Sequence, residues 1–201
     1  MDIIKHTINN VIVYEYAKTS IYVIENILDD NFCEEMINYI NSVELIDSIF
    51  ENPNNRLLNC KYLHLDKYNE KHIEYDFKIY QVIHIIFLIM MKIIPSLHIT
   101  GDTIYHLRKI YGATKLHTDS VRSSHNDYYF NKVRCMAAIL TLNDNYNGGE
   151  FIFPTQNINI KLKKGSVLLF PPFWTHPHEV SKIEDNQFRY TITTWGTEDV
   201  V

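Results

Sequence analysis

Short apolar runs alternate with turn residues along the C-terminal half of the chain. All six glycines lie at or after Gly101, so this half is rich in tight-turn signals. Many short runs separated by turns predict a sandwich or barrel of β-strands. The predicted strands cover residues 103–111, 133–142, 149–153, 158–162, 166–170, the residues around His178 and residues 188–195.

Two helices are predicted in the N-terminal half. Residues 31–43 carry an apolar stripe at helical spacing, and Asn31 with Glu34 resembles the start of a capping box. Residues 74–94 form a longer apolar segment. This segment predicts a helix that ends before Pro95, because proline cannot continue it.

The remaining N-terminal segments are shorter. Residues 10–28 predict two short strands, and residues 48–72 are polar and predicted to be irregular. One domain is the simplest organisation. Residues 1–100 would supply supporting strands and helices, and residues 101–201 would form the β-core. The predicted fold class is α+β, mainly β.

The composition excludes several classes of protein. The chain has 201 residues, of which 46% are hydrophobic and 21% charged, as in ordinary globular proteins. A formal net charge of −5 argues against a nucleic-acid partner. The three cysteines lack zinc-ligand spacing, and neither a signal peptide nor a membrane-spanning run is expected. We therefore expect reduced thiols in a cytoplasmic protein.

His117 and Asp119 stand one residue apart, just after a run that is predicted to be a strand. Alternate residues of a strand share a face, so the two side chains would project together. Metal binding, a buried hydrogen-bonded pair and a surface coincidence all explain this spacing. Two further histidines, His176 and His178, follow in FPPFWTHPHEV. Two histidines and one carboxylate form the facial triad of non-haem Fe(II) oxygenases.

An arginine opens the last predicted strand. In FRYTITTW, Arg189 shares one face with Thr191 and Thr193. A guanidinium near such a triad could hold a carboxylate through two parallel hydrogen bonds.

Four blocks of the sequence, in this order and spacing, resemble the 2-oxoglutarate and Fe(II)-dependent dioxygenases, and among them the prolyl 4-hydroxylase-like group. The resemblance covers roughly the C-terminal half, and the first hundred residues match only loosely. It implies a double-stranded β-helix, or jelly-roll, core. The blocks are RKIYGATKLHTD, VRCMAAILTLNDNYNGGEFIF, IKLKKGSVLLFPPFWTHPHEV and FRYTITTW.

The resemblance assigns roles to individual residues. His117 and Asp119 match the first two iron ligands. His178 is preferred to His176 as the third, because the family ligand is followed by a small or polar residue and then valine, as in HEV. Arg189 matches the residue that pairs with the distal carboxylate of 2-oxoglutarate.

Four further residues are expected at the co-substrate. Thr191 would be the hydroxyl partner of the arginine, with Thr193 as a competing choice. Tyr111 matches a family tyrosine that reaches 2-oxoglutarate, although a core aromatic is an equal alternative. Thr141 is expected to point inward and touch the co-substrate.

The implied activity is hydroxylation of a prolyl residue of a peptide or protein, coupled to oxidative decarboxylation of 2-oxoglutarate to succinate and CO2. Fe(II), 2-oxoglutarate and O2 are implied, with ascorbate as a reductant. A free amino acid or another protein residue remains open as substrate. The rivals are an AlkB-like nucleic-acid demethylase, a non-catalytic jelly-roll module and a zinc hydrolase. The loop after Asp119, with Tyr128, Tyr129 and Phe130, is expected to border the substrate opening.

Overall fold

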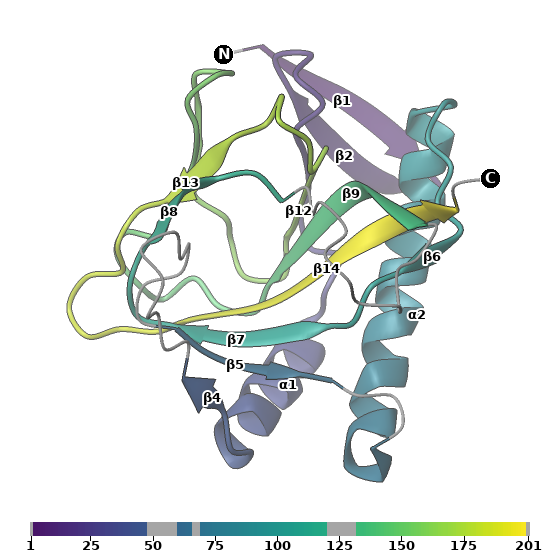
Figure 1. The fold of residues 1–201 in the computed structure, drawn as a ribbon. Coiled ribbons are helices and arrows are strands. Elements are labelled where there is room, and N and C mark those ends of the chain that lie inside the picture. The colour runs from purple at the N-terminus through teal and green to yellow at the C-terminus, as the bar shows by residue number, and fades with distance from the viewer. Residues whose placement is uncertain (1, 48–59, 66–68, 120–131, 200–201) are drawn as a thin grey trace.

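Two antiparallel sheets face each other, and two helices cover the outer side of the larger sheet (Figure 1). The computed structural model describes residues 2–47, 60–65, 69–119 and 132–199. Two facing antiparallel sheets are the jelly-roll arrangement, so the predicted fold class is confirmed. The elements in chain order are β1 Ile3–Ile8, β2 Val11–Tyr16, β3 Tyr22–Ile24, α1 Asp30–Ser42, β4 Ile46–Asp47, β5 Cys60–His64, α2 Glu70–Ile93, β6 Gly101–Asp102, β7 His106–Ile110, β8 Thr114–His117, β9 Lys132–Thr141, β10 Phe151–Phe153, β11 Ile158–Ile160, β12 Val167–Phe170, β13 His178–Val180 and β14 Arg189–Asp199.

The strand order brings distant parts of the chain together. The larger sheet runs β1-β2-β3-β12-β9-β14-β7-β5-β4, with β6 paired to β14, and the smaller sheet runs β11-β10-β13-β8. The N-terminal strands therefore extend both edges of a sheet whose centre comes from the C-terminal half. β8 and β13, which carry the predicted ligand histidines, are neighbours in the smaller sheet.

The last strand, β14, divides its side chains between two cores. Tyr190 and Ile192 belong to the core beneath the helices. Trp195 belongs to the core between the sheets. Because successive residues of a strand point to opposite faces, Arg189, Thr191 and Thr193 face the same interior as the indole.

Both helices start earlier than the sequence pattern predicts. The side chain of Asp29 accepts a hydrogen bond from the backbone N–H of Phe32 at 2.7 Å, so the predicted cap at Asn31 is wrong by two residues. Asp29, Asp30 and Asn31 can all cap a helix, and the local pattern does not choose among them. α2 begins at Glu70, behind an Asn69 cap.

The predicted strands of the C-terminal half are all present, with ends that differ by a few residues. The prediction for residues 48–72 is wrong in part, because residues 60–64 form β5. The sequence CKYLH has no clear alternation of apolar and polar residues. Pairing with β7 makes it a strand. β1 was likewise absent from the predicted elements.

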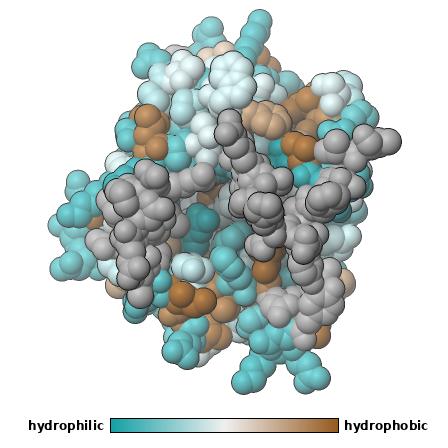
Figure 2. Space-filling view, viewed as in Figure 1, coloured by the Kyte–Doolittle hydropathy of each residue, from teal (hydrophilic) through white to brown (hydrophobic). Residues whose placement is uncertain are grey.

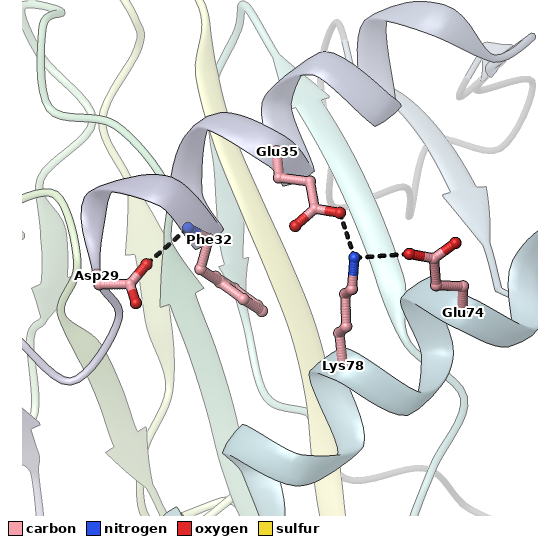
Figure 3. A network of polar contacts seen from close by, with 5 residues as sticks. All are labelled: Asp29, Phe32, Glu35, Glu74 and Lys78. Atoms are coloured by element: carbon pink, nitrogen blue, oxygen red, sulfur yellow. Dashed lines mark hydrogen bonds and ion pairs between the residues drawn. The ribbon is translucent and has the colours of Figure 1, made fainter.

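An ion-pair network joins the two helices on the outer face. Lys78 of α2 pairs with Glu35 of α1 and, at 2.8 Å, with Glu74 of its own helix (Figure 3). Within the described ranges, no helix combines the length and apolar character that a membrane span requires. The surface in the view of Figure 2 mixes hydrophilic and hydrophobic side chains in small groups. The loop with Tyr128, Tyr129 and Phe130 lies outside the described residues.

Candidate metal and co-substrate site

The three predicted metal ligands converge on one point. His117 ends β8, His178 begins β13 directly opposite it, and Asp119 follows β8. One ligand atom from each residue lies within 4.8 Å of the others, and His117 Nε2 lies 3.2 Å from Asp119 Oδ1. Adjacent ligands that share one ion at about 2.1 Å lie about 3 Å apart. The donor set, and the spacing of His117 and Asp119 within it, therefore fit a metal ion.

Backbone carbonyls orient both histidines. His117 Nδ1 donates to Lys115 O at 2.7 Å, and His178 Nδ1 donates to His176 O at 3.2 Å. A carbonyl can only accept, so Nδ1 carries the proton in each ring. Nε2 of both rings is left with a lone pair for a metal, an outer-shell arrangement typical of metal-bound histidines.

Asp119 is buried and held on both sides. Burial raises the pKa of its carboxyl, but the contacts with the imidazoles of His117 and His178 and with the indole of Trp195 together hold that pKa well below its usual range. Trp195 Nε1 donates to Asp119 Oδ2 at 3.1 Å, and Arg134 donates to the backbone oxygen of Asp119 at 3.0 Å. The carboxylate is therefore ionised and fixed in position for a cation.

His176 does not join this group. Its ring is buried, Nε2 donates to Thr19 O at 2.7 Å, and Nδ1 accepts from Thr175 Oγ1 at 2.8 Å. These contacts attach the β12–β13 loop to the turn between β2 and β3. His178 is thus the histidine that the structure brings to His117 and Asp119, while His176 holds the loop that precedes it.

Arg189 is buried at the start of β14. Its guanidinium carbon lies 5.0 Å from the ring centroid of Phe151, and Nη1 donates to Gly149 O at 3.4 Å. Nε has no hydrogen-bond partner among the described residues. Burial lowers the pKa of Arg189, yet arginine keeps its proton in proteins. A buried guanidinium with so few partners costs free energy unless an anion joins it, which fits a carboxylate ligand.

The turn that supplies this carbonyl depends on glycine. Gly148 and Gly149 have φ of +73° and +74°, a backbone conformation that glycine adopts without steric cost. A Cβ added at Gly148 would lie 1.9 Å from Lys182 O. A larger residue there would displace the backbone that faces Arg189.

The three predicted threonines line the same interior. Thr141 pairs directly with Thr191 across β9 and β14, and both are buried, as is Thr193. Thr141 Oγ1 has no hydrogen-bond partner within the described part of the chain. An unpaired buried hydroxyl is costly, so Thr141 is open to a polar ligand.

Tyr111 lies apart from this group. Its ring packs edge-on against Phe188 with centroids 6.1 Å apart. Both rings line a groove of about 490 Å³ beside α1, together with Lys109. Lys109 donates to Asn41 of α1, so this groove lies on the helix side of the sheet.

Several aromatic side chains and one arginine near the site were not predicted as site residues from the sequence. Arg134 stacks over Trp195 at 3.8 Å, His106 packs edge-on against Trp195 at 5.3 Å, and His64 packs against His106 at 4.2 Å. Burial, then Arg108 and His64, lower the pKa of His106 to about 2, so its imidazole is neutral. Alternation within residues 103–111 was the available signal, because it places His106 and Arg108 on one face.

Comparison with known families supports the same chemistry. Residues 106–197 match the family described as the 2OG-Fe(II) oxygenase superfamily. This segment runs from β7 almost to the end of β14 and contains the three ligand residues and Arg189. No curated protein matches the chain significantly.

Solved structures show the same fold. A prolyl hydroxylase from Trichoplax adhaerens, in complex with a hypoxia inducible factor oxygen degradation domain peptide fragment, has a TM-score of 0.66 and 19% identity over 89% of this chain and 84% of its own. The viral collagen prolyl hydroxylase from Paramecium Bursaria Chlorella virus-1, in its 2OG complex, has a TM-score of 0.66 and 16% identity, and the match covers 90% of this chain and 97% of its own. A Pseudomonas putida prolyl-4-hydroxylase has a TM-score of 0.61 and 18% identity, and the match covers 90% of this chain and 93% of its own.

These findings confirm the resemblance to the 2-oxoglutarate and Fe(II)-dependent dioxygenases. The match to the family covers the part of the chain that carries the site. The structural matches extend the likeness, as a likeness of fold with solved prolyl hydroxylases, to about nine-tenths of the chain.

Proposed function

Starting from a 2-oxoglutarate and Fe(II) oxygenase domain with the fold of prolyl hydroxylases, we propose that this chain hydroxylates a prolyl residue of a peptide or protein. 2-Oxoglutarate would be converted to succinate and CO2 in the same cycle. The observation that carries the proposal is the convergence of His117, Asp119 and His178 in a barrel whose interior also holds the buried Arg189.

Each residue has a distinct role in the proposal. His117, Asp119 and His178 hold Fe(II), which when bound supplies the activation of O2 and the oxidation chemistry. Arg189 pairs with the distal carboxylate of 2-oxoglutarate, which would satisfy a guanidinium that is otherwise poorly paired. The hydroxyl of Thr191, or of Thr193 in its place, donates a hydrogen bond to the same carboxylate.

Of two further side chains predicted at the co-substrate, one belongs to the proposed site and one does not. The hydroxyl of Thr141, on the strand beside β14, has no partner among the described residues and would donate a hydrogen bond to the co-substrate. Tyr111 is left out of the proposed site, because its ring packs with Phe188 on the helix side of the sheet.

The remaining assignments belong to the same proposal. A peptide or protein is the proposed substrate, supported by structural neighbours that are prolyl hydroxylases, one of them in complex with a peptide fragment. Ascorbate is proposed as the reductant that restores ferrous iron. The free thiols of Cys33, Cys60 and Cys135 are consistent with a reducing, cytoplasmic compartment.

An anaerobic titration tests the cofactor chemistry. Fe(II) and then 2-oxoglutarate are added to the purified protein, and the weak visible charge-transfer band of the chelated complex is recorded for the wild type and for Asp119→Ala. We expect a band in the wild type that is absent from the variant, with circular dichroism showing that both are folded. A folded wild type without the band would contradict the proposal and favour a non-catalytic jelly-roll module.

A further inference from the structure

The turn between β12 and β13 displays two aromatic side chains. Trp174 is 81% exposed and Phe173 is 38% exposed. The other of the two tryptophans in the chain, Trp195, is 5% exposed inside the barrel. Tryptophan is highly buried on average, and exposed aromatic side chains are enriched where proteins bind partners. Trp174 is the most exposed large apolar side chain among the described residues.

The turn is held in place from both sides. His176 N donates to Phe173 O at 3.0 Å and closes the turn. Gln156 Nε2, from the turn between β10 and β11, donates to Thr175 O at 2.7 Å, and His176 Nε2 donates to Thr19 O at 2.7 Å. A surface that is already ordered loses little conformational freedom when a ligand binds. The indole is thus presented on a fixed support.

The turn is close in sequence to His178, a predicted metal ligand. Trp174 precedes His178 by four residues, and four residues span at most about 14 Å. An extended peptide advances about 3.4 Å per residue. A peptide with one residue at the metal therefore covers this maximum distance within about four residues.

We propose that Phe173 and Trp174 form an aromatic rim that binds an apolar side chain of a polypeptide substrate, within about four residues of the hydroxylated one. This proposal rests on the proposed function and adds a second contact between the chain and its peptide or protein substrate. Two side chains on one turn supply much less than the roughly 800 Å² per partner that a stable dimer buries. A single apolar side chain of a peptide matches the rim better.

A peptide series tests the rim through turnover. Each peptide holds one proline and one leucine that is moved stepwise away from it, and a leucine-free peptide and free proline complete the series. Succinate formation and oxygen addition by mass spectrometry are measured for the wild type, Trp174→Ala and Phe77→Ala. Phe77 is a matched control, because it is 57% exposed on α2.

We expect Trp174→Ala to lower kcat/KM at least about tenfold for peptides with a nearby leucine. Phe77→Ala should leave kcat/KM unchanged, and peptide-independent succinate formation should be the same in all three proteins. Equal kcat/KM for the wild type and Trp174→Ala, or a wild type that acts on free proline as well as on any peptide, overturns the rim.

Fluorescence separates this proposal from the proposed function. Iodide should quench the exposed indole of Trp174 and not the buried Trp195, and the same leucine peptides should protect the exposed indole. If the peptides protect the Trp174 indole from iodide but no succinate forms, the rim is supported and the proposed reaction is contradicted. If succinate forms but the peptides do not protect the indole, the proposed reaction is supported and the rim is contradicted. A dimer that Trp174→Ala converts to a monomer would assign the rim to a second copy of the chain and overturn the proposal.

Discussion

Buried polar atoms have hydrogen-bond partners at the proposed metal end of the barrel and are underpaired at its proposed co-substrate end. At the metal end, His117 and His178 each donate to a backbone carbonyl, and Asp119 accepts from an indole. At the co-substrate end, Arg189 Nε and Thr141 Oγ1 have no hydrogen-bond partner among the described residues.

The difference follows from what each end has to bind. A metal ion needs ligands whose orientation is set beforehand by hydrogen bonds from their surroundings. A dicarboxylate brings its own acceptor oxygens, so donors that await it stay underpaired and cost free energy in the free protein. Substitutions at the metal end should therefore abolish binding, whereas substitutions at the co-substrate end should also stabilise the free protein.

The largest expected effect separates the two neighbouring histidines. His178→Ala should weaken Fe(II) binding by more than about 100-fold, because it removes one of three ligands, whereas His176→Ala should weaken it by about 10- to 100-fold through the loosened loop. Anaerobic calorimetric titration measures both affinities, and His84→Ala, on an exposed part of α2, is the control. An intact affinity in His178→Ala together with a lost one in His176→Ala would reverse the assignment.

Arg189→Met tests the underpaired guanidinium. The variant should bind 2-oxoglutarate at least about 100-fold more weakly, and the free energy of unfolding of the free protein should rise by about 1 kcal/mol or more, because a buried charge with few partners is removed. Urea unfolding with and without 2-oxoglutarate measures both effects.

Arg134→Met is the matched control for Arg189→Met. This guanidinium already donates to Asp119 O and stacks on Trp195, so its loss should lower the free energy of unfolding. A comparable destabilisation in Arg189→Met would show that Arg189 is satisfied without a ligand.

The smallest effect concerns a single hydroxyl. Thr141→Val keeps the shape of the side chain and removes an unpaired group, so the free protein should gain about 1 kcal/mol while 2-oxoglutarate binding weakens several-fold. Thr194→Val is the control, because the hydroxyl of Thr194 donates to Thr103 O at 3.0 Å and its loss should destabilise. If both variants lose stability alike, Thr141 is not held ready for a ligand.

Local pattern was sufficient for the predicted strands of the C-terminal half and for the types of residue at the candidate site. Alternation along 188–195 placed Arg189, Thr191 and Thr193 on one face, and β14 has them there. Local pattern was insufficient where neighbouring residues offer equal choices. The helix cap fell on Asp29 rather than Asn31, and β5 exists because it pairs with β7.

The β-core, the residue types of the candidate site and the order of the sequence blocks could be predicted from the chain alone, because strand periodicity and donor type are local properties. Which distant groups meet depends on tertiary packing. It set His178 opposite His117, turned His176 toward the β2–β3 turn and placed Tyr111 beside α1. Each of these depends on a pairing register or on packing between segments far apart in the chain, which no local pattern encodes.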